Sequence, residues 1–287
     1  ARIWNDLFEP RRMALQSLLN RADASDTEWQ RALSRTVIEA ADDMLHYVAM
    51  TELALQTLRA QLDFPEGDQQ ALVKTLLHRV KYPLQGTPAN VIKQLSAILD
   101  ATGSGPFAKR FDRFVTYDTY EEDHHIDEKG ELVDSDVPAK RVETLAQEFV
   151  DDARTRMENT ERVIQCAGQR ASEFGRQVAS RSFGVFDLDR EIFGRAESLS
   201  GEVNIGFLSG YLESLRRLDP ARWECRALDL LKADAPRRWQ TGAVVFSGFS
   251  PAVVARLLAL FDAQALEASR FLPIGWKVGE EYLSGSE

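Results

Sequence analysis

The sequence has little cysteine, histidine or methionine. Its 287 residues include 2 Cys, 4 His and 4 Met. Two cysteines exclude a framework of disulfides and a structural zinc site built from cysteines, since both need more thiols than this chain carries. Hydrophobic residues at 44% and charged residues at 28% are ordinary values for a folded globular chain. The length allows one large domain or two ordinary ones.

Long apolar runs and a secretion signal are also missing. The first residues contain no apolar core and no small-residue cleavage site. The most apolar stretch, residues 243–261, is interrupted by Gly248, Pro251 and Arg256, whereas a membrane span needs roughly 20 mostly apolar residues. We therefore expect a cytoplasmic protein without a membrane partner. Because the chain begins without Met and soon enters a helical pattern, we also expect it to be a segment of a longer protein.

Motifs for phosphate binding and nucleophilic catalysis are absent from the sequence. No GxxxxGK[ST] occurs. Residues 103–108 fit GxGxxA only formally, since they follow a helical pattern and Pro106 lacks the amide that a phosphate would contact. Ser209 and Ser247 stand in Ser-Gly pairs but not in a GxSxG motif. We therefore expect no catalytic residue and no cofactor in this chain.

Acidic residues outnumber basic ones, 45 to 35, and they are concentrated in one stretch. Residues 118–136 hold eight of the ten excess negative charges, with Lys129 as their one basic residue. The carboxylates are those of Asp118, Glu121, Glu122, Asp123, Asp127, Glu128, Glu131, Asp134 and Asp136. The acidic balance disfavours nucleic acid, which binds basic surfaces. The rest of the chain is nearly neutral, however, so a helical nucleic-acid-binding module stays open as an alternative function.

Three interpretations of this acidic stretch stay open. We favour a solvated acidic insertion, because a run of like charge usually faces water. The second interpretation is a docking surface for a basic protein partner. Its contact residues would be Glu121, Glu122, Asp123, Asp127 and Glu128.

The third interpretation is a metal site, because carboxylates and imidazoles are metal ligands. Its candidate ligands are His124, His125, Glu121 and Asp123. Neighbouring residues of a strand point to opposite sides, so His124 and His125 would rarely bind one ion. If such a site exists, the alternative function is a metal-dependent hydrolase that uses these residues and Glu122.

Two long helices dominate the predicted fold. Apolar residues recur every three or four positions from Trp29 to Leu62, with one seven-residue gap, and predict a helix of about 35 residues. A capping box at residues 25–28 would begin it. A second pattern runs from Val142 to Val178. Within it, Gly168 and Gly175 indicate either a close approach of two helices or a break, and both alternatives stay open.

Shorter elements complete the prediction. Helices are expected at residues 4–19, 68–82 and 89–99, and after the Asp-Pro and Ser-Pro pairs at 219–220 and 250–251. Alternating β-formers around residues 114–138, with a turn at 127–130, predict a β-hairpin or an ordered loop. The predicted regions are an N-terminal helical region at 1–114, the acidic insertion at 115–137, and a long helix with helical repeats at 138–287.

Several single residues are expected to be structural. Cys166 and Cys225 are interpreted as buried thiols, and Trp223, Trp239 and Trp276 as packing residues. The arginines between residues 154 and 181 alternate with carboxylates, which is typical of a solvated helix face with weak i,i+4 pairs.

A weak repeat occurs in the C-terminal part. The residues FLSGY at 207–211 are echoed by VFSGF at 245–249, and a period near 40 built from helix pairs is typical of HEAT-like solenoids. Residues 204–277 begin NIGFLSGYLESLRRLDP and end FLPIGWK. They resemble the helical-repeat regions that follow the ATPase core in large bacterial NTPases of the STAND type, including anti-phage proteins. The resemblance implies a solenoid that senses a partner while the nucleotide site lies elsewhere, and it carries over no catalytic residue.

These observations predict an all-α chain of long antiparallel helices, with a HEAT-like C-terminal part and one acidic hairpin or loop insertion. The function that we expect is a non-catalytic recognition module or scaffold of a larger bacterial protein such as a defence-type NTPase. Its partner would be another protein, because stacked helix pairs offer a long rigid surface without the need for catalytic groups.

Overall fold

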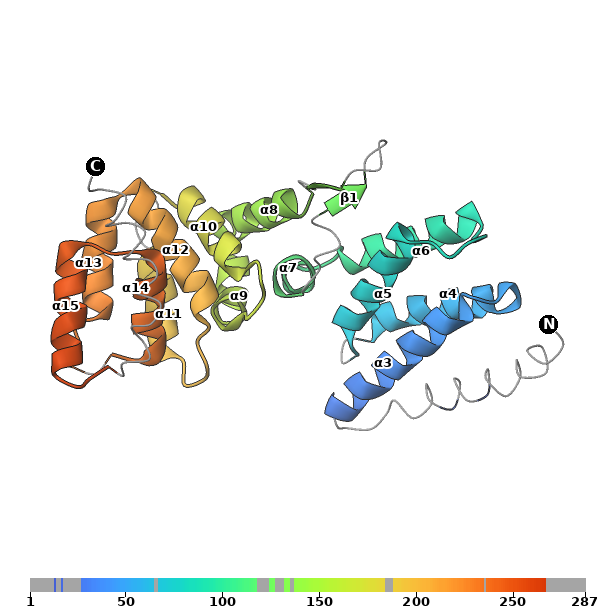
Figure 1. Cartoon of the computed structure of the whole chain (residues 1–287), viewed down its shortest axis with the longest axis horizontal. Helices are drawn as coiled ribbons and strands as arrows, with labels where there is room; N and C mark the ends of the chain where they lie inside the picture. The colour runs from blue at the N-terminus through green and yellow to red at the C-terminus, as the bar shows by residue number, and fades with distance from the viewer. Residues whose placement is uncertain are drawn as a thin grey trace. The chain divides into compact units, whose positions relative to one another are not determined.

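The computed structural model describes residues 13, 17, 27–64, 67–117, 124–126, 132–134, 137–183, 188–234 and 236–266. These residues form two compact units. The first contains the described residues up to Arg113 and residues 124–126 and 132–134; the second contains residues 114–117 and those from 137 onward. In Figure 1 the chain runs from blue through green in the first unit and from green to red in the second.

Helices make up the first unit, apart from two short strands, in the described part of the chain. The elements are α3 Thr27–Met44, the 3-10 turns η1 Val48–Met50 and η2 Gln61–Asp63, α4 Thr51–Ala60, α5 Gln69–Lys81, α6 Ala89–Thr102 and α7 Phe107–Phe111. The π-helical turn η3 Asp112–Thr116 begins in this unit and ends in the second. Helix α3 packs on α4 and α5, and α5 packs on α6 (Figure 1). The core between them contains Ile38, Leu58, Leu72 and Leu95, each at most 2% exposed.

The single long helix predicted from Trp29 to Leu62 is wrong. The chain turns after Met44, where the amide of Tyr47 donates to the carbonyl of Met44, and a separate helix α4 starts at Thr51. The break lets α4 return along α3, so that Met44, Met50 and Ala54 share one apolar cluster. The seven-residue gap in the apolar spacing coincides with this break. Val48, the last residue of the apolar pattern before this gap, is 89% exposed.

Helix starts in the first unit follow local capping. The predicted helix at 68–82 is confirmed as α5, whose N-cap Asp68 accepts a hydrogen bond from the amide of Ala71 at 2.9 Å. Helix α6 begins at Ala89 as predicted, although Pro88 itself stands at the N-cap position. The predicted helix at 4–19 and the start of the predicted capping box at 25–28 lie outside the described residues, apart from residues 13 and 17.

The two strands are β1 His124–Ile126 and β2 Leu132–Asp134, which pair antiparallel with His125 opposite Val133. They lie within the predicted acidic insertion. The residues between them, where a turn was predicted, lie outside the described residues, so the hairpin insertion stays a prediction.

The second unit is also helical in its described part. Its helices are α8 Val137–Asp151, α9 Ala153–Gln165, α10 Ala171–Arg181, α11 Leu188–Ser198, α12 Ile205–Leu218, α13 Pro220–Leu230, α14 Arg238–Ser247 and α15 Pro251–Asp262. Helix α12 packs on α10, α13 and α14, and α15 packs on α13 (Figure 1). Phe174 links the core of α8 to that of α12, because its ring lies 5.8 Å from Phe149 and 6.0 Å from Phe207. The all-α class is thus correct for the described chain.

The second predicted long helix is also broken, into α8, α9 and α10. Asp152 interrupts it with an extended backbone, and its carboxylate caps α9 by accepting from the amide of Arg154 at 2.9 Å and the hydroxyl of Thr155 at 2.6 Å. The next break follows Cys166, which is also extended. Because each break allows the next helix to run in a different direction, α8 packs on both α9 and α10.

Of the two predicted alternatives, a helix break applies to Gly168 and a close approach of two helices applies to Gly175. Gly168 lies in the break between α9 and α10, where a Cβ would lie 2.1 Å from the carbonyl oxygen of Val115. Gly175 lies inside α10 and lets α12 approach closely, since a Cβ there would lie 2.1 Å from the carbonyl oxygen of Phe207. Gly210 of α12 plays the same part in return, because its Cβ would lie 2.0 Å from the carbonyl oxygen of Ser172.

The two copies of the Ser-Gly repeat do not occupy equivalent positions. Ser209 and Gly210 lie within α12, whereas Ser247 ends α14 and Gly248 is its C-cap, with a φ of 132°. A period based on this pair therefore does not describe a repeating structural unit. The caps predicted for the next helices are confirmed: Asp219 accepts from the amide of Arg222 at 3.0 Å, and Ser250 from that of Val253 at 3.3 Å.

Candidate functional site

The site residues predicted from the sequence belong to the acidic stretch, most of which lies outside the described residues. Glu121, Glu122, Asp123, Asp127 and Glu128 lie outside the described residues. His124 and His125 contribute backbone to β1, and their side chains are not described. Among the described residues, no group of three or more His, Cys, Asp or Glu side chains could hold a metal ion. In the same residues no helix combines the length and apolar character of a membrane span.

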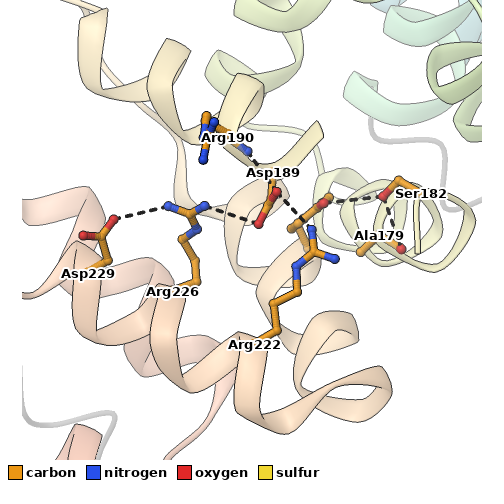
Figure 2. A network of polar contacts seen from close by, with 8 residues as sticks. Ala179, Ser182, Asp189, Arg190, Arg222, Arg226 and Asp229 are labelled. Atoms are coloured by element: carbon orange, nitrogen blue, oxygen red, sulfur yellow. Dashed lines mark hydrogen bonds and ion pairs between the residues drawn. The ribbon is translucent and has the colours of Figure 1, made fainter. Parts of the chain in front are cut away.

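A buried carboxylate contacts two arginines in the second unit (Figure 2). Asp189 of α11 has a side chain that is 8% exposed. One of its oxygens lies 3.0 Å from Arg222 Nη2 and the other 3.3 Å from Arg226 Nη2, both on α13. Arg226 also contacts Asp229 at 3.3 Å. The arrangement ties α11 to α13 through charge, with Arg226 lying over the ring of Phe193 at 5.5 Å.

The electrostatics of this network keep Asp189 ionised. Burial by itself raises the pKa of its carboxyl, but the hydrogen bonds and charges of Arg222 and Arg226 outweigh burial and hold that pKa below its ordinary value. Nearby, burial raises the pKa of Tyr211, whose hydroxyl lies 3.4 Å from that of Ser182. With these directions of shift the network bears fixed charges around neutral pH, and it positions helix α13.

The outer half of α15 is apolar. Val253, Leu257 and Leu260 are buried in the unit. The exposed residues of this helix are Pro251, Ala252, Ala255, Leu258, Ala259, Phe261 and Asp262. Leu258 is 53% and Phe261 41% exposed. Asp262 is thus the one charged residue on the exposed half of a helix, where charged and polar residues are normally concentrated.

A groove of about 500 Å³ borders the starts of α13 and α15. Among the residues that line it are Arg216, Arg217, Trp223, Glu224, Phe249 and Ser250. The guanidinium carbon of Arg216 lies 5.9 Å from the centre of the Trp223 ring. Trp223 is 2% exposed, and its Nε1 donates to the hydroxyl of Ser247 at 3.0 Å. The guanidinium of Arg216 therefore lies at this groove against the ring of Trp223, which is itself buried and hydrogen-bonded.

The first unit has a smaller cavity of about 270 Å³ beside the ion pair of Arg79 and Asp42. Arg79 contacts both carboxylate oxygens of Asp42, at 2.5 and 2.6 Å, and these hydrogen bonds raise the pKa of the guanidinium. His46 Nε2 lies 3.4 Å from Arg79 Nη2. The rest of the lining is mostly apolar and includes Leu84 and Val91. Because Asp42 already neutralises the arginine, this cavity has little charge with which to select a ligand.

The predicted environments of the cysteines and tryptophans are partly correct. Cys166 is buried as predicted, but Cys225 is exposed. Cys225 follows the buried Trp223 by two residues, which is roughly 200° around a helix, so it lies away from the packed face. Trp223 and Trp239 are buried as predicted, whereas Trp276 lies outside the described residues.

Ion pairs of the arginines in α8–α10 are only partly local. Arg154 pairs with Glu158 four residues later, as the interleaved pattern predicts. Arg181, in contrast, pairs with Glu143 of α8 at 2.5 Å. Sequence spacing missed this pair and the Asp189 network, although the i,i+4 spacing of Arg222 and Arg226 does place both guanidiniums on one face of α13.

No protein-family model, curated protein or solved structure matches this chain significantly.

Proposed function

We propose that this chain is a non-catalytic module that binds another protein, and that the outer half of α15 is part of its contact surface. The observation that carries the proposal is the composition of that surface. A helix that is apolar on both sides is normally covered on both sides, and α13 covers one side of α15. A run of exposed alanines around Leu258 is also flat enough for a second helix to approach closely.

The partner that fits this surface is an amphipathic helix of another protein. Such a helix would lay its apolar side chains along Ala255, Leu258 and Ala259, in the mode by which helices bind apolar surfaces.

The test uses crosslinking in the native cell at a chosen residue. Ala255 is replaced by the photo-reactive residue p-benzoylphenylalanine, with Glu197 on the exposed surface of α11 replaced in a matched control. We expect one adduct of reproducible mass at position 255 and none at position 197. The protein identified in the adduct is then purified and titrated against the chain.

Two variants decide the result of that titration. Leu258→Glu should weaken binding about tenfold or more, because it places a charge in an apolar contact. Met157→Glu changes an apolar residue of α9 that is still more exposed, at 77%, and should leave binding unchanged. The proposal is wrong if position 255 forms no adduct, if the adduct is a second copy of this chain, or if Leu258→Glu binds like the unaltered chain.

We further propose that this module is the partner-sensing region of a bacterial STAND-type NTPase with a HEAT-like C-terminal part. The support for this narrower proposal is the resemblance of residues 204–277 to such regions. Reading the coding sequence around this segment tests it. An upstream GxxxxGK[ST] motif in the same reading frame is the expected result, and a frame that lacks any nucleotide-binding motif contradicts it.

A further inference from the structure

A second cavity of the first unit, of about 260 Å³, lies between α3 and the residues around η2. Its walls are mainly apolar and include Leu33, Val37, Ala60 and Phe64. Leu33 is 5% and Val37 1% exposed, so these two side chains belong to the packed interior. The volume lies just below the range of sites for drug-sized ligands, and it therefore suits a small group.

The buried side chain of Gln61 gives this cavity a polar group. The amide of Asp68 donates to the hydroxyl of Ser34 at 3.0 Å, and that hydroxyl donates to Oε1 of Gln61 at 2.6 Å. Because a hydroxyl has one hydrogen to donate, this bond places Oε1 towards Ser34 and leaves two donors on Nε2. Nε2 makes no hydrogen bond to another described residue. Gln61 is only 3% exposed, so the cavity that it lines is where these donors can meet an acceptor.

Neighbouring residues hold Gln61 in this position. A Cβ at Gly67 would lie 2.7 Å from Ser34 Oγ, so the missing side chain leaves room for the hydroxyl that fixes the Gln61 side chain. Gln69 Nε2 donates to the backbone carbonyls of Gln61 at 2.7 Å and Phe64 at 2.8 Å. Since the donor is ordered before a ligand arrives, little further conformational entropy is lost on binding.

A carboxylate lies at the edge of the same cavity. Asp63 is among the lining residues and is exposed. Within the described part of the chain it forms no hydrogen bond and no ion pair. An ionised carboxylate accepts hydrogen bonds and repels anions. The cavity thus combines apolar walls, a buried donor and an acceptor at its edge.

We propose that this cavity binds a small aliphatic carboxamide. The carbonyl oxygen of the ligand accepts from Gln61 Nε2, its N–H group donates to Asp63, and its aliphatic part lies against Leu33 and Val37. A carbonyl that pairs with a buried donor removes the cost of leaving that donor unpaired. A carboxylic acid of the same size is ionised around neutral pH, lacks the N–H group and is repelled by Asp63. This site is independent of the contact proposed for the outer half of α15, so the failure of either proposal leaves the other standing.

NMR titration of the full chain with three small probes tests the chemistry. The probes are isovaleramide, isovalerate and acetamide, and the signals followed are those of the Gln61 side-chain amide, identified by their absence in Gln61→Met. We expect isovaleramide to shift these signals with saturation. Isovalerate should bind at least about fivefold more weakly, and acetamide at least about tenfold more weakly because it lacks most of the apolar part. If isovaleramide gives no saturable shift, or if either other probe binds as tightly, the proposal is wrong.

Three variants then test the location, with binding measured by saturation transfer to the ligand. Gln61→Met removes both donors at nearly constant volume and should weaken isovaleramide binding about fivefold or more. Asp63→Asn changes an exposed residue and should reduce the preference for isovaleramide over isovalerate about threefold or more. Gln56→Met is the matched control, because Gln56 is an exposed glutamine of α4 outside the cavity, and it should have no effect.

A melting curve by circular dichroism shows which variants remain folded. If Gln61→Met unfolds, Asp63→Asn decides the location. A folded Gln61→Met with the affinity of the unaltered chain or, failing that, Asp63→Asn with an unaltered preference between amide and acid would overturn the assignment to this cavity.

Discussion

The two units hold their helices together by different means. In the first, apolar residues at helical spacing form two clusters, of which the larger includes Leu58, Leu72 and Leu95. In the second, arginines also reach the carbonyl ends of distant helices: Arg237 donates to the carbonyl of Glu197 at 2.9 Å, and Arg256 to that of Leu231 at 2.8 Å. In the first unit, Arg110 donates to the carbonyl of Gly105 at 2.9 Å, and this contact spans only five residues.

The helix contacts of the second unit depend more on residues that lie far apart in the sequence. Carbonyls at a helix end need hydrogen-bond donors, and the second unit supplies some of them from helices far along the sequence. Gly175 and Gly210 are likewise needed only because the backbone of a neighbouring helix lies against them. We therefore expect the first unit to depend mainly on burial of apolar side chains, and the second to depend on polar and close backbone contacts as well.

The largest effect is expected from a cavity in the first unit. Leu72→Ala removes a fully buried side chain and should lower the free energy of unfolding by about 3–4 kcal/mol. Val48→Ala, at an 89% exposed position, should change it by less than about 0.5 kcal/mol. Urea unfolding followed by circular dichroism measures both. Equal effects of the two variants would contradict the assignment of the core.

A methyl group at the crossing of α10 and α12 should have the next largest effect. Gly210→Ala places a Cβ about 2 Å from the carbonyl oxygen of Ser172, and we expect a loss of about 3 kcal/mol because backbone must move. Gly194→Ala is the matched control, because nothing lies within 4 Å of its Cβ. It should stabilise α11 by about 1 kcal/mol. Thermal unfolding compares them, and a stable Gly210→Ala variant would show that the helices do not cross so closely.

Neutralising Asp189 should cost about 2 kcal/mol around neutral pH, since it leaves Arg222 and Arg226 without their shared carboxylate. The pKa of Asp189 is lowered in the folded chain. Its stabilising contribution is therefore complete above the unfolded value of about 3.9 and is lost as the pH falls through the lower folded value. Denaturant midpoints of Asp189→Asn and the unaltered chain should thus differ at neutral pH and converge below about pH 4. A difference that does not depend on pH would rule out this charge effect.

The smallest effect is expected from an arginine at a helix end. Arg256→Gln removes donors from the carbonyls of Leu231, Lys232 and Ala233 and should cost about 1 kcal/mol. Arg154→Gln, in an exposed i,i+4 pair, should cost less than Arg256→Gln does, because an exposed ion pair contributes little to stability. Chemical unfolding of both variants provides the comparison. If Arg154→Gln lowers the free energy of unfolding more than Arg256→Gln does, the distant arginine contacts do not distinguish the second unit from the first.

Local signals in the sequence predicted the helix starts well. Asp68, Asp219 and Ser250 cap the helices that follow them, because a capping side chain bonds to amides two or three residues away. Such a signal is complete within a short window. The helical class and the burial of Cys166 followed from the same local periodicity.

Breaks and sites required information from further away. The spacing from Trp29 to Leu62 fits one helix and also two helices joined by a turn, and packing of α4 on α3 decides between them. Asp189 lies 33 residues before Arg222, so no window of helical length contains both. The groove beside Arg216 depends on three separate segments, of α12, of α13 and of the loop after α14. The acidic stretch was conspicuous in the sequence because its charges are adjacent, whereas the groove was not.

Because one cysteine is exposed and the other is buried, thiol labelling can report the local opening of the second unit. Cys225 is accessible and Cys166 is buried between the hydroxyl of Thr116, at 3.4 Å, and the amide of Gly168, also at 3.4 Å. A thiol reagent should therefore modify one cysteine quickly in the folded chain and the second only when the junction of α9 and α10 separates. The slow phase of labelling then gives the rate at which this part of the second unit opens, without any change to the sequence.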